Sequence, residues 1–221
     1  LLLPALPEFT RRYPLIELDL RLNDRIVDLV AERVDVALRV GPIRQAGLAA
    51  RRVSQVNIVT CAAPAYLQDH GEPKTPDELR EHKLVGLTSP SGAPPEWTFP
   101  PPYTPKRLGL KFSMLFNSAE APIIAATAGL GITHTGDLLV AEYVGRGELK
   151  LILEDFVMPG PPISLVYPSA GHQLAKVRVF SDFAADLLLR WNVEVRRWIK
   201  QPPRLPAPVS AKLAENPREP T

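Results

Sequence analysis

The first forty residues carry apolar side chains in four successive patterns, which predict the order helix, strand, helix, strand. Apolar residues recur every three to four positions over residues 2–13 and every second position over residues 16–22. A second helical pattern covers residues 26–34, and a second strand covers residues 36–40 and ends at Gly41. Two strands joined by a helix are expected to be parallel, with a right-handed crossover. Clefts of such α/β folds bind small molecules at the carboxyl ends of the strands.

The rest of the chain alternates between short apolar runs and segments rich in proline and glycine. Strands are expected at residues 48–62, 83–88, 108–114, 131–135, 148–153 and 162–168. Helices are expected at residues 64–70, from the capping box at 75–78, from Asn117 or Ser118 to Gly129, at 137–143 and at 174–191. The proline-rich stretch 88–105 reads as a loop, alone or around one short strand at 97–99. The tail after residue 200 has no apolar period and is expected to be disordered.

Composition and charge narrow the class of protein. The chain has 221 residues, 45% hydrophobic content and a formal net charge of +2, which is too small for a nucleic-acid binder by itself. A single cysteine rules out an internal disulfide and fits a reducing cytosol, so we expect a cytoplasmic protein. No apolar run is long enough to span a bilayer, and the N-terminal stretch lacks the basic region of a signal peptide. Leu1 is neither a methionine nor a helix cap, so the chain is expected to be a fragment or an excised domain.

Several segments together resemble the effector-binding domain of LysR-type transcriptional regulators. They occur in the order that the family has, over roughly residues 1–190, and they are LLPALPEFTRRYP, IELDLRLNDRIVDLVAERVDVALRVG, VTCAAPAYL, NSAEAPIIAATAGLGI, GRGEL, ISLVYP and KVRVFSDF. Each segment alone is a weak signal, whereas their common order and spacing make a specific one.

The resemblance implies an α/β fold of the type 2 periplasmic-binding-protein class, in which two α/β subdomains are joined by two crossing segments. The winged helix-turn-helix of the family and the first strand of subdomain I are expected to be missing from this chain. The implied divisions are subdomain I at 1–60 and 165–190, subdomain II at 61–164, a C-terminal extension at 191–221, and crossings near 61–64 and 162–168.

The same resemblance implies an effector site between the subdomains. The residues expected there are Arg39, Gly41, Cys61, Phe116, Asn117, Ser118 and His134. Asn117 and Ser118 are expected at a helix start, where free N–H groups and partial positive charge suit an anionic metabolite. The alternative is an ordinary N-cap that stabilises the helix by about 1 kcal/mol.

Other candidate chemistry is weaker. Cys61 has no His or Lys near it in sequence, so it is expected to be a small buried hydrophobic residue, with pocket lining as a second role. His134 follows the segment GLGI, where the family often has Leu-Pro, and is expected to be a polar group of the pocket. The four histidines show no metal-ligand spacing, so neither a metal nor a cofactor is expected. Gly129 and Gly131 follow a helix rather than a strand, which indicates a helix C-cap and not a dinucleotide fingerprint.

Three function classes follow. The first is the effector-sensing and dimerisation domain of a bacterial regulator, which binds a small metabolite, forms a homodimer or higher homo-oligomer, and contacts DNA only through a part outside this chain, with no membrane partner. The second is a periplasmic solute-binding protein of a transport system, which would have the same fold. The third is an enzyme, which is disfavoured because no nucleophile elbow, P-loop or acid–base set occurs in the sequence.

Overall fold

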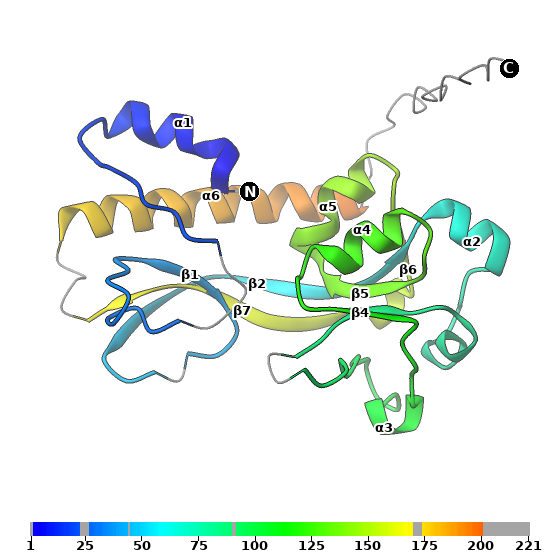
Figure 1. The fold of residues 1–221 in the computed structure, drawn as a ribbon. Helices are drawn as coiled ribbons and strands as arrows, with labels where there is room; N and C mark the ends of the chain where they lie inside the picture. Colours follow the sequence, from blue (N-terminus) through cyan, green and yellow to red (C-terminus); the bar gives the residue numbers. More distant parts are fainter. Residues whose placement is uncertain (1, 23–26, 44, 90–91, 170–173, 201–221) are drawn as a thin grey trace, which may run out of the picture.

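A long antiparallel pair of strands runs through the middle of the molecule, and the other elements gather around its two ends (Figure 1). The computed structural model describes residues 2–22, 27–43, 45–89, 92–169 and 174–200, without the side chains of 192, 194 and 196–200. The paired strands are β2 (Leu48–Ala62) and β7 (Met158–Pro168). The C-terminal tail, which was expected to be disordered, lies outside the described residues.

The main sheet has five strands, all paired antiparallel. Its order is β1 (Ala37–Val40), β7, β2 and β5 (Thr133–Gly136), and β6 (Lys150–Ile152) also pairs with the end of β2. The β2–β7 pairing shifts register twice, between Arg52 and Ser54 and between Gln55 and Asn57. Strand β2 therefore pairs with β7 along its first part and with β5 and β6 at its end.

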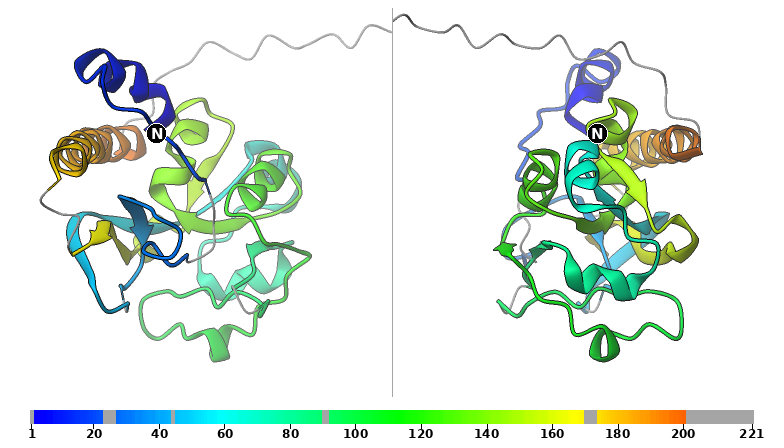
Figure 2. Two further views of the ribbon diagram at one scale, coloured as in Figure 1. Left: turned by 60° about the vertical axis from the view of Figure 1, so that its left-hand side comes forward. Right: turned by 90° about the vertical axis from the view of Figure 1, so that its right-hand side faces the viewer.

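Two helices cover one face of the sheet at the β1 end. The long helix α6 (Ala175–Lys200) lies along β2 and β7, and α1 (Leu2–Arg12) packs on top of it (Figures 1 and 2). Phe9 of α1 is fully buried, with its ring centroid 5.4 Å from that of Phe180 and 5.1 Å from that of Phe183. The apolar face predicted for α1 therefore holds the two helices together.

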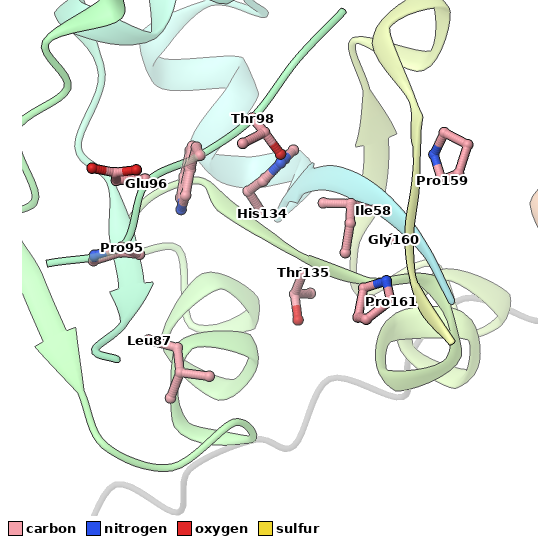
Figure 3. Close-up of a pocket in the computed structure, with 12 residues that line it drawn as sticks. Ile58, Leu87, Pro95, Glu96, Thr98, His134, Thr135, Pro159, Gly160 and Pro161 are labelled. Carbon is pink, nitrogen blue, oxygen red and sulfur yellow. The ribbon is translucent and has the colours of Figure 1, made fainter. Parts of the chain in front are cut away.

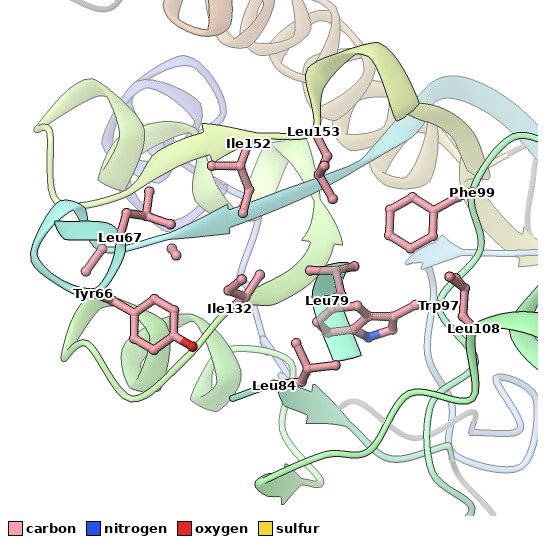
Figure 4. Close-up of a cluster of buried hydrophobic side chains, with 12 residues drawn as sticks. Tyr66, Leu67, Leu79, Leu84, Trp97, Phe99, Leu108, Ile132, Ile152 and Leu153 are labelled. Atoms are coloured by element: carbon pink, nitrogen blue, oxygen red, sulfur yellow. The ribbon is translucent and has the colours of Figure 1, made fainter. Parts of the chain in front are cut away.

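The other end contains shorter elements around a second core. They are α2 (Pro64–His70), a 3-10 helix η1 (Pro76–Glu81), β3 (Val85–Leu87), α3 (Pro105–Leu108), β4 (Met114–Phe116), α4 (Ala121–Thr127), α5 (Asp137–Gly145) and a 3-10 helix η2 (Glu154–Phe156). Strands β3 and β4 are parallel. Leu79, Leu84, Trp97, Phe99 and Ile132 lie in the buried cluster that these elements enclose (Figure 4).

The predicted strand–helix unit after α1 is wrong. Residues 16–22 form no strand, and residues 27–34 form turns, in which the Asp28 carboxylate accepts hydrogen bonds from the N–H groups of Val30 and Ala31. Alternating apolar and polar residues do not form a strand without a neighbouring strand to pair with. The apolar side chains of Leu15 and Leu22 are 97% and 77% exposed, so they are not held against a core. The predicted parallel crossover is also wrong, because β1 pairs antiparallel with β7.

Two further boundaries differ from the prediction. Leu108 ends α3 instead of opening a strand, because Thr104 Oγ1 accepts a hydrogen bond from the N–H of Arg107 and starts a helical turn there. The strand predicted at 108–114 is wrong except at its last residue, because β4 begins at Met114, and residues 97–99 form no strand. The predicted C-cap is confirmed: Gly129 has a φ of +77°, and the N–H of Leu130 bonds to the carbonyl of Ala125.

Candidate functional site

A solvent-open cleft of about 520 Å³ lies where β2, β5 and β7 meet the proline-rich loop that precedes α3 (Figure 3). Its volume falls in the usual range of small-molecule sites, roughly 300–1,000 Å³. Its lining residues are Ile58, Leu87, Pro95, Glu96, Trp97, Thr98, His134, Thr135, Gly136, Pro159, Gly160 and Pro161. The wall thus joins segments that are a hundred residues apart in the chain.

Buried polar bonds and close glycine contacts hold this wall together. The carboxylate of Asp137, which is 1% exposed, accepts hydrogen bonds from the backbone N–H of Asn57 (3.1 Å) and from its side-chain amide (2.7 Å). A Cβ on Gly136 would lie 2.7 Å from a methyl of Val56, and one on Gly160 would lie 2.8 Å from the side chain of Ile58. Glycine at these positions therefore lets β5 and β7 approach β2 closely.

His134 is a neutral part of the wall. Its Nδ1 lies 2.9 Å from the hydroxyl of Thr60, and its ring centroid lies 5.2 Å from that of Trp97 and 4.6 Å from that of Phe99. Its Nε2 is buried and has no hydrogen-bond partner in the described structure. Burial lowers the pKa of the imidazole to about 4, although the nearby carbonyl of Thr98 favours the charged form. The side chain consequently brings no positive charge to the cleft at neutral pH.

Two predicted site residues lie on β1, away from the cleft lining. Arg39 pairs in the sheet with Ser164, and its guanidinium donates a hydrogen bond to the carbonyl of Val27. Gly41 directly follows the strand with a φ of +113°, and its N–H donates to the carbonyl of Pro162 (2.9 Å). Both residues therefore serve the packing of β1 against its neighbours.

Cys61 and Phe116 belong to a hydrophobic core under α4 and α5. Cys61 has no exposed surface, and burial raises the pKa of its thiol to about 12. The prediction that it is a buried small residue is confirmed, and it does not line the cleft. Phe116 is half-buried at the end of β4 and packs against the same core.

The predicted helix start at Asn117–Ser118 is wrong. Helix α4 begins at Ala121, after Glu120 in the cap position, and Pro122 occupies its first turn. Proline fits a first turn because the N–H that it lacks would have no partner there, so Pro122 sets the start three residues later. Asn117 and Ser118 are exposed, and Ser118 lines a separate hollow of about 290 Å³ with Ala119, Glu120, Ile123, Leu139 and Tyr143.

The structure therefore brings only one of the seven predicted residues, His134, to the cleft. Of the eleven lining residues that sequence analysis missed, seven lie in two proline-rich stretches, Pro95–Thr98 and Pro159–Pro161, and the others are Ile58, Leu87, Thr135 and Gly136. Trp97 and Phe99 could have indicated the first stretch, because two large apolar residues within a proline-rich loop are typical of a segment that packs into a core. No pattern in the sequence around Pro159–Pro161 indicated that this stretch lines the same cleft as Pro95–Thr98.

Comparison with known proteins identifies the family. The model of the LysR substrate-binding domain matches residues 1–188, so this chain belongs to that family. YhjC of Escherichia coli, an HTH-type transcriptional regulator, is 33% identical over 199 residues, which cover 85% of this chain and 63% of that protein. The regulator CrgA of Neisseria meningitidis is 31% identical over 191 residues, which cover 85% of this chain and 62% of that protein.

Solved structures agree with the family. The regulatory domain of CrgA matches with a TM-score of 0.77 at 30% identity, over 85% of this chain and 92% of that one. The effector domain of AmpR from Pseudomonas aeruginosa shares the fold, with a TM-score of 0.69 at 22% identity over 90% of this chain and 92% of that one. The type 2 periplasmic-binding-protein-like α/β fold is thus confirmed.

The chain spans about three fifths of the length of the curated relatives that it matches. Those relatives are transcriptional regulators, and the transport solute-binding alternative gains no support from them. Within the described ranges, no helix combines the length and apolarity needed to cross a bilayer. The same ranges hold no cluster of three or more potential metal ligands.

Proposed function

We propose that this chain is the effector-sensing and dimerisation domain of a bacterial LysR-type, DNA-binding transcriptional regulator that acts in the cytoplasm. The observation that carries the proposal is the family match over residues 1–188, together with the cleft at the junction of β2, β5 and β7. DNA would be contacted by a winged helix-turn-helix in the part of such regulators that this chain does not match.

The division into subdomains at 1–60 with 165–190 and at 61–164 remains part of this proposal. In its favour, β2 exchanges β7 for β5 and β6 as pairing partners near this boundary, beginning at Ile58. The cleft lies beside Ile58, close to where the pairing of β2 changes. By this division Ile58 is the one lining residue of subdomain I, and the other eleven belong to subdomain II.

Such an effector acts only through a difference in its affinity for two arrangements of the regulator. A coupling free energy of roughly 1–3 kcal/mol changes the population of the arrangements about 5- to 150-fold, which is enough to alter promoter occupancy. The relatives are regulators rather than enzymes, so the bound molecule is proposed to act as a signal rather than as a substrate.

The test uses the full-length regulator, its own promoter and the small-molecule fraction of a host-cell extract as the source of effector. Leu87→Trp places an indole at the cleft from a side chain that is already 40% exposed. We expect it to abolish the change in transcription that the extract causes, while DNA binding without extract stays unchanged. Leu115→Trp is the matched control, because Leu115 is 41% exposed on the neighbouring strand and lies outside the lining.

A full response of Leu87→Trp would remove the cleft as the effector site. Ser118→Arg tests the second hollow in the same assay. If Ser118→Arg alone loses the response, the effector binds where the sequence predicted its charge to be held, beside Asn117 and Ser118.

A further inference from the structure

Among the described residues that line the cleft, no side chain carries a positive charge at neutral pH. Neither Arg nor Lys occurs among its twelve lining residues, and His134 is neutral at physiological pH. The other ionisable side chain of the lining is Glu96, which is exposed at the rim in the same loop as Pro95 and Thr98 (Figure 3). Its carboxylate gives the lining a formal negative charge.

Proline lowers the number of backbone hydrogen-bond donors in the wall. Anions in proteins are held by backbone N–H groups and cationic side chains. Proline has no backbone N–H, and three of the lining residues, Pro95, Pro159 and Pro161, are prolines. These positions offer carbonyl oxygens alone. Proline therefore removes backbone N–H groups that could hold an anion from both proline-rich stretches of the wall.

The remaining surface is mainly apolar. Ile58, Leu87 and Trp97 contribute side chains to the lining together with the proline rings. In Figure 3 the side chain of Thr135 lies between Leu87 and Pro161, so a hydroxyl stands within an otherwise apolar part of the wall. A lining of this kind accommodates an aromatic or aliphatic ring and orients it with a few polar groups.

From these three observations we propose that the cleft selects a ring-bearing ligand that is cationic or neutral, and that it discriminates against carboxylates. Glu96 supplies the charge preference. The inference rests on the proposed function, since it assigns the chemical class of the effector. It differs from the anionic effector predicted from Asn117 and Ser118, residues that lie outside the cleft lining.

The experiment compares three probes that differ only in their polar group: benzylamine, benzyl alcohol and phenylacetate. Binding to the 221-residue chain is followed at low salt through the NMR shifts of the Thr135 and Gly136 amides. We expect benzylamine to bind at least about tenfold more tightly than phenylacetate, with benzyl alcohol between them, because one nearby charge changes affinity about fivefold in either direction.

Two variants separate charge from shape. Glu96→Gln is expected to reduce the ratio between benzylamine and phenylacetate to about twofold or less. Glu81→Gln is the control, since Glu81 is an exposed carboxylate on η1 outside the lining, and it should leave the ratio unchanged. Leu87→Trp should block all three probes and so place them in the cleft.

Each contrary result has a distinct meaning. Tighter binding of phenylacetate that Leu87→Trp blocks would overturn the charge class and leave the effector site standing. A preference for benzylamine that survives Glu96→Gln would overturn the role of Glu96. If no probe shifts the cleft amides, the ligand class is overturned, and the promoter experiment then decides the proposed function on its own.

Discussion

At position 134 the chain places an imidazole between two aromatic rings, with one nitrogen bonded to a threonine hydroxyl and the other buried without a partner. Burial destabilises the protonated imidazole more than the neutral one, so His134 contributes a neutral polar ring to a hydrophobic wall. The sequence could place His134 near the cleft through its position after GLGI. It could not reveal the environment that keeps the side chain neutral.

The lowered pKa of His134 predicts a dependence of stability on pH. The unfolded chain binds a proton below pH 6.5, whereas the folded chain does so only near pH 4. Stability is therefore full above pH 6.5, falls as the pH drops from 6.5 to 4, and loses about 2 kcal/mol between pH 7 and pH 5. Urea unfolding at both pH values measures the loss.

His134→Gln is the control for this prediction, because it removes the titrating group and can retain a bond to Thr60. Burial also lowers the pKa of His82, so part of the loss persists in that variant, and the difference between the two proteins isolates His134. An imidazole signal of His134 that titrates near pH 6.5 in the folded protein would contradict the argument.

Among the elements, α6 shows how one helix is divided between core and solvent. Leu188 is 3% exposed and packs against Val56 and Ile163 of the sheet, whereas its neighbour Leu189 is 52% exposed. Leu187 and Trp191 are half-buried, and the buried face of the helix includes Ala184, Ala185 and Leu188.

These neighbours provide a matched pair of variants. Leu188→Ala is expected to lower the free energy of unfolding by about 3 kcal/mol, because it leaves a cavity between α6 and the sheet. Leu189→Ala removes the same atoms from a solvent-exposed position and should cost about 0.5 kcal/mol or less. Chemical denaturation of both variants measures the difference. Equal losses would show that the burial of α6 is misassigned.

Elements with local start and stop signals were predictable. Pro64 and Gly71 bracket α2, and the apolar stripe of α6 matches its long helix. Segments whose structure depends on pairing or packing with residues far away in the sequence could not be predicted. Residues 16–22 alternate like a strand, but no neighbouring strand pairs with them among the described residues. The cleft followed the same rule, because Glu96 in a loop and Pro159 on β7 line one cleft although they are far apart in the sequence and no local pattern relates them.

On the scale of the whole molecule, the proposed function includes a homodimer, and the family resemblance supports it. We expect light scattering of this chain at micromolar concentration to give about twice the mass of one chain. A single-chain mass at that concentration would count against dimerisation through this domain. Dilution should shift the mass downward if the association is reversible.

The prolines of β7 have a consequence for association between copies of the molecule. Strand β1 pairs with β7 only from Ile163 onward. On that side, the part of β7 before Ile163 is therefore an edge of the sheet. An exposed edge normally invites another strand to add to the sheet, which leads to aggregation. Pro159, Pro161 and Pro162 deny an incoming strand the N–H groups that it would need. The prolines of β7 that line the cleft therefore also disfavour the addition of a strand from another molecule at this edge.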